Sequence, residues 1–174
     1  MLTNFMPASL SFAGILKNAP YQVCFTPGGK CTHLIVKTIN TAKNSIRVQA
    51  YSFTSWPIVR ALIKAQERGV KVELLLDKSN LKKRYNVIKA LKSHHIKFLI
   101  DAKPAIAHNK VIIIDGDIVV TGSFNFTYSA QKRNAENVLI IKNKKLASLY
   151  IANYDKRQQA SQAVAYYCGY NQCS

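Results

Sequence analysis

The chain alternates between short runs of apolar residues and longer stretches in which apolar residues recur with helical spacing. The short runs predict strands buried on both faces, and the longer stretches predict helices with one apolar face. The predicted strands are residues 21–25, 46–51, 70–76 and 96–100, and the predicted helices are residues 33–43, 83–94, 146–164 and one that begins after Ser55 and ends at Gly69. This alternation is typical of an α/β sandwich, in which α-helices flank a mixed β-sheet.

Residues 108–115, with the sequence HNKVIIID, form a further apolar run that begins with polar side chains. If this run is a strand, its alternation directs His108 and Lys110 to the same face. A glycine-containing turn and a second apolar run follow, which predicts a β-hairpin. The hairpin would bring Ser123 and Asn125 back beside His108.

These side chains suit attack on a phosphodiester. A histidine can act as nucleophile or proton donor, and a lysine supplies a compact positive charge for the non-bridging phosphate oxygens. The amide of Asn125 can donate hydrogen bonds without adding charge. The sequence therefore predicts chemistry carried by His108, Lys110 and Asn125, with no cofactor and no metal.

The spacing of this segment, H-x-K-x4-D-x6-G-S-x-N, resembles the signature of the phospholipase D superfamily, and the chain matches every fixed position. Within that superfamily the chain looks like the small bacterial Nuc-type endonucleases. Residues 45–53, the helix after Trp56 and residues 134–137 resemble the same group, and the likeness covers roughly residues 20–155. The resemblance implies a phospholipase D-like α/β sandwich with one motif per chain.

The remaining motif positions and one glutamate receive separate predictions. Asp115 falls at the hairpin turn, away from the histidine, so we expect it and Gly122 to have structural roles. Glu136 opens its own apolar run, and similar enzymes carry a glutamate here. A carboxylate that holds one imidazole nitrogen would fix the tautomer of His108. Ser123 either joins this network or caps the following turn.

The chain contains one copy of the motif and no internal repeat. The family fold is usually built around two motifs, so the resemblance implies a two-fold homodimer that brings two copies of His108 together. One neutral His108, oriented by Glu136, would attack phosphorus to form a phosphohistidine, and the partner's His108 would protonate the leaving oxygen. Lys110 and Asn125 would stabilise the developing charge before water resolves the intermediate.

The charge balance predicts polyanionic partners. The chain has 25 Lys and Arg residues against 8 Asp and Glu, a formal net charge of +17, so polyanions such as nucleic acid are the expected partners. A basic run without acidic residues covers residues 78–97, and Lys132 and Arg133 follow the motif. We expect these residues to contact a phosphate backbone, although a solvated helix face has the same pattern. The run contains Lys78, Lys82, Lys83, Arg84, Lys89, Lys92 and Lys97.

Aromatic residues lie around the predicted loops of the site, and any that are exposed could stack on unpaired bases. They are Tyr51, Phe53, Trp56, Phe124, Phe126 and Tyr128. We expect Phe53 and Phe124 in the core, whereas Trp56, at a helix start after a loop, is a candidate for contact with a base or a lipid. Stacking would favour single-stranded over duplex substrates. The sequence leaves DNA and RNA equally open.

The four cysteines form two close pairs, Cys24 with Cys31 and Cys168 with Cys173. We favour a disulfide within each pair, because each would close a small loop outside the motif. A structural zinc site is the alternative, but the spacings lack the two-residue turn of zinc ribbons. Disulfides would imply an exported protein.

Residues 1–16 carry no charge and are largely apolar. We expect residues 1–19 to be a signal or anchor remnant, or an extra helix, ahead of a nuclease domain over residues 20–174. No other stretch approaches the run of about eighteen apolar residues that a transmembrane span needs. We therefore expect a periplasmic, cell-surface or secreted protein, with peripheral membrane association as an option.

Three functions compete. A metal-independent endonuclease acting on DNA or RNA leads. A phospholipase D-type lipid phosphodiesterase is second, because the single motif and the charge suit polynucleotides better, although anionic lipid head groups would also be attracted. A binding protein without cleavage is third, and the intact motif counts against it.

Overall fold

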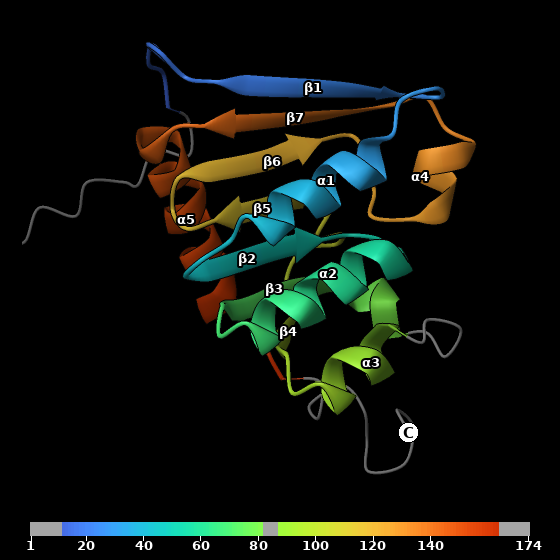
Figure 1. Cartoon of the computed structure of the whole chain (residues 1–174). Coiled ribbons are helices and arrows are strands. Elements are labelled where there is room, and N and C mark those ends of the chain that lie inside the picture. Colours follow the sequence, from blue (N-terminus) through green and yellow to red (C-terminus); the bar gives the residue numbers. More distant parts are fainter. Residues whose placement is uncertain (1–11, 82–86, 164–174) are drawn as a thin grey trace, which may run out of the picture.

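The computed structural model of the chain describes residues 12–81 and 87–163. Seven strands of this part of the chain form one sheet in the order β1-β7-β6-β5-β2-β3-β4 (Figure 1). The strands are β1 (Tyr21–Thr26), β2 (Ser45–Ala50), β3 (Lys71–Asp77), β4 (Lys97–Asp101), β5 (Lys110–Ile114), β6 (Ile118–Gly122) and β7 (Glu136–Lys142), and the helices are α1 (Cys31–Asn40), α2 (Trp56–Glu67), α3 (Val87–Ser93), α4 (Tyr128–Lys132) and α5 (Lys144–Gln159).

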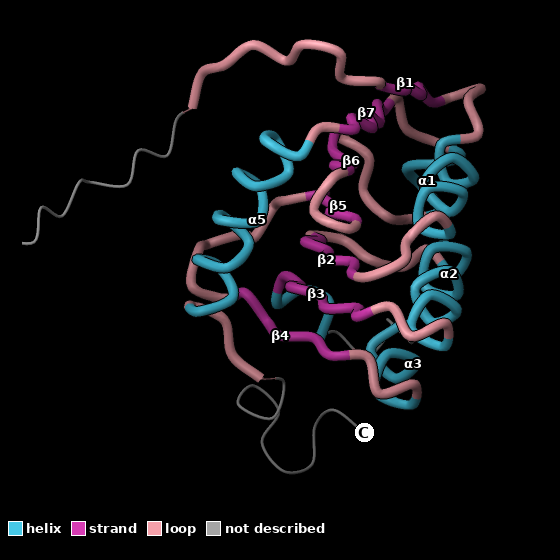
Figure 2. Tube along the Cα trace, turned by 60° about the vertical axis from the view of Figure 1, so that its left-hand side comes forward, coloured by secondary structure: helices cyan, strands magenta, loops and turns pink. Residues whose placement is uncertain are grey.

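The sheet is the middle of three layers. Helices α1, α2 and α3 lie on one face, and α5 lies along the other (Figure 2). Strands β2, β3 and β4 are parallel, whereas β1, β5, β6 and β7 join through antiparallel pairs. The predicted fold class, a mixed sheet flanked by helices, is therefore confirmed.

Three predicted helices differ from the structure. The helix predicted at residues 146–164 spans Lys144–Gln159. The helix predicted at residues 33–43 begins at Cys31 and ends at Asn40. The helix predicted at residues 83–94 is described as α3 alone, preceded by a short 3-10 helix at Lys78–Leu81, with residues 82–86 outside the described part.

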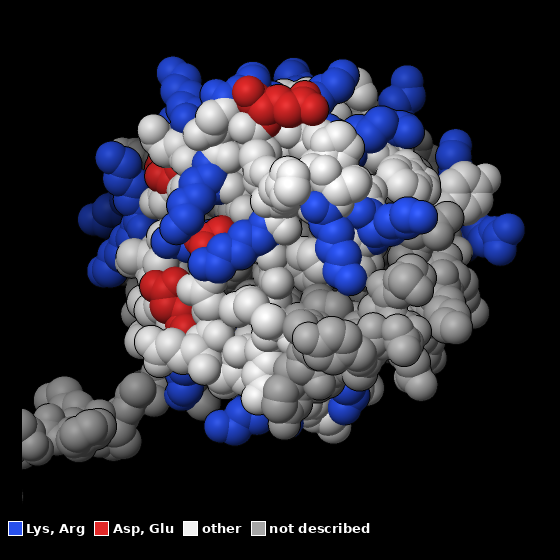
Figure 3. Space-filling model, turned by 90° about the horizontal axis from the view of Figure 1, so that it is seen from below, with Lys and Arg blue, Asp and Glu red and all other residues white. Residues whose placement is uncertain are grey.

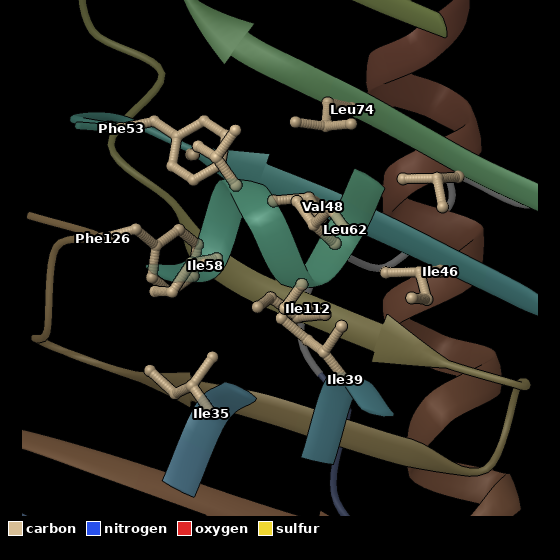
Figure 4. Close-up of a cluster of buried hydrophobic side chains, with 14 of the residues drawn as sticks. Ile35, Ile39, Ile46, Val48, Phe53, Ile58, Leu62, Leu74, Ile112 and Phe126 are labelled. Atoms are coloured by element: carbon tan, nitrogen blue, oxygen red, sulfur yellow. The ribbon is translucent and has the colours of Figure 1, made fainter. Parts of the chain in front are cut away.

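The larger core lies between the sheet and the helices α1 and α2 (Figure 4). A second, smaller core lies on the α5 side of the sheet. Strand β5 contributes to both cores, because Ile112 and Ile114 face the larger one and Val111 and Ile113 face the smaller one. All five residues of β5 are buried. Burial of one such side chain is worth about 2 kcal/mol, and a one-residue slip would exchange the two faces. The register of β5 is therefore fixed on both sides.

Strand pairing brings the ends of several strands to one edge of the sheet. Ala50, the last residue of β2, pairs with both Leu76 near the end of β3 and Lys110, the first residue of β5. The end of β6 at Gly122 pairs near the start of β7. We call this edge the motif end; it is on the right in Figure 1. Loops that leave β2, β3 and β6 and enter β5 and β7 meet there.

The hairpin turn lies at the opposite end of β5. Asp115 and Gly116 have φ values of +53° and +64°, the left-handed region that Asp and Gly tolerate best. The Asp115 carboxylate accepts hydrogen bonds from the backbone N–H groups of Lys43, Asn44 and Ser45 at 2.8–2.9 Å. It thereby joins the turn to the start of β2.

One disulfide, between Cys24 of β1 and Cys31 of α1, is present, which confirms the first predicted pair. The second pair, Cys168 and Cys173, lies outside the described residues. Phe53 and Phe124 are each 1% exposed, as predicted, and Trp56 is 42% exposed.

The N-terminal segment is described only from residue 12. Residues 12–20 precede β1 and contain neither helix nor strand. Within residues 12–81 and 87–163, none of the helices combines the length and apolar character that crossing a bilayer requires.

Replacing Asp115 by Asn should lower stability in a pH-dependent way. Burial alone would raise the pKa of Asp115, but the N–H groups of Ser45, Lys43 and Asn44 outweigh it and hold the pKa below its usual value. A lowered carboxyl pKa gives stability that is complete above the unfolded value of about 3.9 and is lost as the pH falls through the folded value. We expect urea unfolding to show a loss of about 2 kcal/mol for Asp115→Asn at pH 7.

The same comparison at pH 3 is the control for this prediction. The difference between the wild type and Asp115→Asn should shrink there, because the wild-type carboxyl begins to protonate. An equal difference at both pH values would show that the charged form of Asp115 is not what stabilises the turn.

Candidate active site

His108 lies two residues before β5, with its ring held by two neighbours. Nζ of Lys110 lies 2.9 Å from Nδ1 of the ring and donates a hydrogen bond to the His108 carbonyl at 2.7 Å. The ring also packs against Tyr51, with centroids 4.5 Å apart. Because an ammonium group can only donate, Nδ1 is the acceptor in this arrangement, and a neutral ring then carries its proton on Nε2.

Lys110 is a cation that the fold buries, with 7% of its surface exposed. Its Nζ lies 5.1 Å from the centre of the Tyr51 ring. Burial lowers the pKa of Lys110, and the charge of Glu136 acts in the opposite direction. A partly desolvated ammonium group interacts more strongly with an arriving phosphate than one in bulk water.

Ser123 and Glu136 form a second group beside the first. The Ser123 hydroxyl donates to Oε2 of Glu136 at 2.6 Å and accepts from the backbone N–H of Asn137 at 3.1 Å. The other carboxylate oxygen, Oε1, accepts from the side-chain amide of Asn134 at 2.9 Å. The sequence left two roles open for Ser123, a hydrogen bond in the network of Glu136 or a cap on the following turn. The structure shows the hydrogen bond to Glu136.

The expected bond between Glu136 and His108 is not formed in this chain. Nδ1 of His108 faces Lys110 instead, and both oxygens of Glu136 have other partners. The reason is the strand order: β6 lies between β5 and β7, so Glu136 starts two strand spacings, about 10 Å, from the start of β5. Ser123, at the end of β6, occupies the position between them.

Gly122 and Asn125 complete the motif at this edge. Gly122 has a φ of +142°, and a Cβ there would lie 2.2 Å from the carbonyl oxygen of Asn137, so only glycine fits. Oδ1 of Asn125 is buried and has no hydrogen-bond partner among the described residues. Such unpaired buried groups are rare in folded proteins and often mark functional positions.

An open pocket of about 570 Å³ joins the two groups. As the predicted hairpin requires, Ser123 and Asn125 line the same pocket as His108 and Lys110. Gly122 and Glu136 line it too, and the rest of the wall comes from Asn109, Val111, Thr121 and Tyr150. The pocket therefore holds a ring nitrogen, an ammonium group, an amide and a carboxylate.

The predicted substrate-binding residues are divided between the two ends of the sheet. Four of them belong to segments at the motif end: Lys78 directly after β3, Trp56 at the start of α2, and Lys132 and Arg133 at the end of α4. Lys97, at the start of β4, lies at the opposite end and pairs with Glu73 at 2.8 Å. Lys82, Lys83 and Arg84 lie outside the described residues. The basic run is therefore not one patch.

Basic side chains also cover a wide area of the molecule. On the face seen from below the view of Figure 1, Lys and Arg are spread over the surface while Asp and Glu are few (Figure 3). The surface thus attracts polyanions broadly, and the motif end has only part of that charge.

Sequence reasoning named Tyr51 only as one of the aromatic residues near the site loops, and it missed Tyr150. Tyr51 directly follows β2, and its place in the loop at the motif end was a usable signal, because β2 pairs with β5. Tyr150 lines the pocket from α5, a helix about forty residues along the chain from His108. Nothing in the sequence indicates that contact, since it depends on how α5 crosses the sheet.

Comparison with known proteins agrees with this geometry. Residues 35–157 match the family described as cardiolipin synthase, PLD-like domain. A protein of Rickettsia prowazekii named phospholipase D is 51% identical over 149 residues, which cover 86% of this chain and 73% of that protein.

Two solved structures share the fold. Nuc from Salmonella typhimurium, a phospholipase D family member, superposes with a TM-score of 0.78 at 37% identity, over 83% of this chain and 97% of Nuc. NucT from Helicobacter pylori gives a TM-score of 0.75 at 25% identity, over 83% of this chain and 99% of NucT. The family match and these relatives show that the chain belongs to the phospholipase D superfamily and is a phosphodiesterase with a single PLD-like domain.

Proposed function

We propose that the protein is a metal-independent endonuclease that hydrolyses phosphodiester bonds of DNA or RNA as a homodimer. The observation that carries this proposal is the open pocket in which His108, Lys110 and Asn125 meet the Ser123–Glu136 pair. The likeness to Nuc and NucT and the net charge of +17 support nucleic acid as the substrate.

In the proposed reaction, Nε2 of one His108 attacks phosphorus while the bond to the leaving oxygen breaks. The partner's His108 gives its proton to that oxygen. Water then attacks the phosphohistidine, its proton passes to the second imidazole, and the first His108 is released. Lys110 and Asn125 stabilise the charge on the phosphate oxygens in both steps.

The two imidazoles need different protonation states. The proton donor is an imidazolium with a proton on each ring nitrogen, so that the ring is neutral after it gives up the proton on Nε2. In this chain Nδ1 of His108 faces the Lys110 ammonium and accepts from it, so Nδ1 has to turn away from Lys110 for either role. The attacking ring needs a free Nε2, so its proton must sit on Nδ1 and face an acceptor. Glu136 is the carboxylate of the same pocket, and we assign it that role in the reacting complex.

The proposed dimer follows from the number of histidines. His108 is the one described histidine that lines the pocket, whereas the reaction uses two. The pocket is open to solvent, so a second copy related by a two-fold axis can present its own His108 to the same phosphate.

The motif end also offers contacts for unpaired bases. Trp56 is 42% exposed and Tyr128 is 63% exposed, and the Arg133 guanidinium lies 6.0 Å from the centre of the Tyr128 ring. Exposed aromatic rings beside basic residues bind single strands through stacking and phosphate contacts. These residues support single-stranded nucleic acid as the preferred substrate.

A lipid phosphodiesterase is the second candidate. The rickettsial relative at 51% identity is named phospholipase D, which favours it. Both reactions use the same attack on phosphorus, so a phospholipid has to be tested beside nucleic acid.

We further propose export of a nuclease domain that starts near residue 20. The Cys24–Cys31 disulfide supports this, because such bonds persist mainly in oxidising compartments. Peripheral membrane association is part of this proposal through the apolar residues that precede β1.

Replacing His108 by Ala should abolish cleavage while leaving binding intact. We expect turnover of single-stranded DNA or RNA, assayed with excess EDTA, to fall by at least about a thousandfold, because the variant lacks both nucleophile and proton donor. His94→Ala, an exposed histidine after α3, is the matched control and should cleave like the wild type. Loss of wild-type activity in EDTA, or release of head groups from phosphatidylcholine without nicking of nucleic acid, would contradict the proposal.

A heterodimer with one defective histidine tests the shared site. Wild type and His108→Ala carrying two different affinity tags are co-expressed, and the mixed species is isolated through both tags. Because each phosphate needs both imidazoles, the mixed dimer should have less than about one-hundredth of the wild-type activity. An independent site in each chain would instead leave half of the activity.

Removing both basic residues at the end of α4 should weaken binding without changing the chemistry. The double variant Lys132→Ala/Arg133→Ala should bind a single-stranded oligonucleotide less tightly, and its log–log salt slope should fall by roughly 0.7 for each phosphate that the protein no longer neutralises. Lys64→Ala/Arg68→Ala, an exposed basic pair near the end of α2, is the matched control. Equal effects of both pairs would mean that only total charge matters.

A further inference from the structure

Two buried polar residues lie at the end of β3 and in the short 3-10 helix that follows it. Asp77 is 3% exposed and Asn80 is 2% exposed, and neither lines the pocket. Buried polar side chains persist when hydrogen bonds compensate for their loss of water. Their partners therefore indicate what they hold in place.

Asp77 holds the chain where it enters the motif. Its Oδ2 accepts a hydrogen bond from the backbone N–H of Ala107 at 2.8 Å, and its Oδ1 accepts one from the N–H of Ser79 at 2.8 Å. Ala107 is the residue immediately before His108. The carboxylate thus ties the backbone beside the imidazole to the rigid end of β3.

Asn80 holds the loop that carries Tyr51. Its Nδ2 donates to the carbonyls of Tyr51 at 2.6 Å and Asp77 at 3.0 Å, and its Oδ1 accepts from the N–H of Phe53 at 3.1 Å. The Tyr51 ring, in turn, packs against His108 and lies 5.1 Å from Nζ of Lys110. Asn80 therefore fixes the loop that carries the Tyr51 ring, which packs against the imidazole of His108 and lies beside the ammonium group of Lys110.

The same loop connects the two halves of the motif. The N–H of Tyr51 donates to the carbonyl of Asn109 at 2.9 Å, next to His108. The N–H groups of Thr54 and Ser55 both donate to the carbonyl of Phe126 at 2.9 Å, next to Asn125. A shift of this loop would therefore move His108 relative to Asn125.

We propose that Asp77 and Asn80 are positioning residues for the reaction, which fix His108 and the Tyr51 ring from behind the pocket without touching the substrate. This inference rests on the proposed role of His108. Attack on phosphorus requires close alignment, and a displacement of about 1 Å can reduce the rate about a hundredfold. Two buried polar anchors at the edge of a rigid sheet supply that alignment.

Asp77→Asn is the direct test, because an amide has one acceptor oxygen and can serve only one of the two N–H groups. Asp115→Asn is the matched control: it makes the same chemical change in a carboxylate that also accepts backbone N–H groups, at the other end of β5. Cleavage of bis(p-nitrophenyl) phosphate and of a single-stranded oligonucleotide is measured well below the melting temperature of each variant.

We expect kcat of Asp77→Asn to fall by about ten- to a hundredfold with KM within about threefold, and kcat of Asp115→Asn to stay within about twofold of the wild type. Asn80→Asp is a second test, since it keeps the acceptor for Phe53 but turns an oxygen toward two carbonyls. It should lower kcat in the same way, and Asp77→Glu should recover part of the activity lost in Asp77→Asn.

The ring resonances of His108 report position without relying on catalysis. They should shift in Asp77→Asn and Asn80→Asp and stay unchanged in Asp115→Asn. Wild-type kcat and unshifted resonances in Asp77→Asn, or an equal loss of kcat in Asp115→Asn, would overturn the positioning role. Full activity of His108→Ala would overturn the proposed function instead, and the resonances would still test whether Asp77 sets the ring.

Discussion

The placement of β5 between β2 and β6 is the constraint on which the site depends. All five residues of β5 are buried, and alternate residues serve the two cores, so the strand can neither shift nor rotate without exposing several isoleucines. Its antiparallel pairing with β2 puts Lys110 opposite Ala50, where β2 ends. His108, Lys110, Ser123 and Asn125 therefore meet at one end of the sheet, whereas Asp115 lies in the turn at the other.

The two ends of β5 use polar residues in different ways. At the turn, Asp115 satisfies backbone N–H groups, and its charge has fixed partners. At the motif end, the buried Lys110 ammonium contacts a carbonyl, an imidazole nitrogen and the face of Tyr51, and the charge of Glu136 acts on it without an ion pair among the described residues. These neighbours compensate only in part for lost hydration. A bound phosphate would supply a direct anionic partner, which is why this end, and not the turn, is suited to catalysis.

The fold and the members of the site could largely be predicted from the sequence because both follow from local patterns. Short apolar runs indicated the strands, two such runs around a glycine-containing turn indicated the hairpin, and two close cysteines indicated the Cys24–Cys31 bond. The contacts inside the site could not be predicted. Whether Glu136 reaches His108 depends on β6 lying between their strands, and the anchors Asp77 and Asn80 act through backbone groups that have no sequence signature.

Many basic side chains lie away from the pocket that holds His108 and Lys110, and their distance from that pocket limits their effect on a phosphate bound there. Exposed basic residues at the far end of the sheet, such as Lys144 after the end of β7, lie about one strand length, roughly 17 Å, from the motif end. Salt screens exposed charges beyond about 8 Å under physiological conditions, so these residues contribute little to a phosphate in the pocket. Under the proposed function, their role is in the approach of a long polyanion, which would span both ends at once. Lys110, shielded from solvent beside His108, would act on the one phosphate that enters. A polymer of phosphates would then use both effects together, whereas a single lipid head group would use only the second.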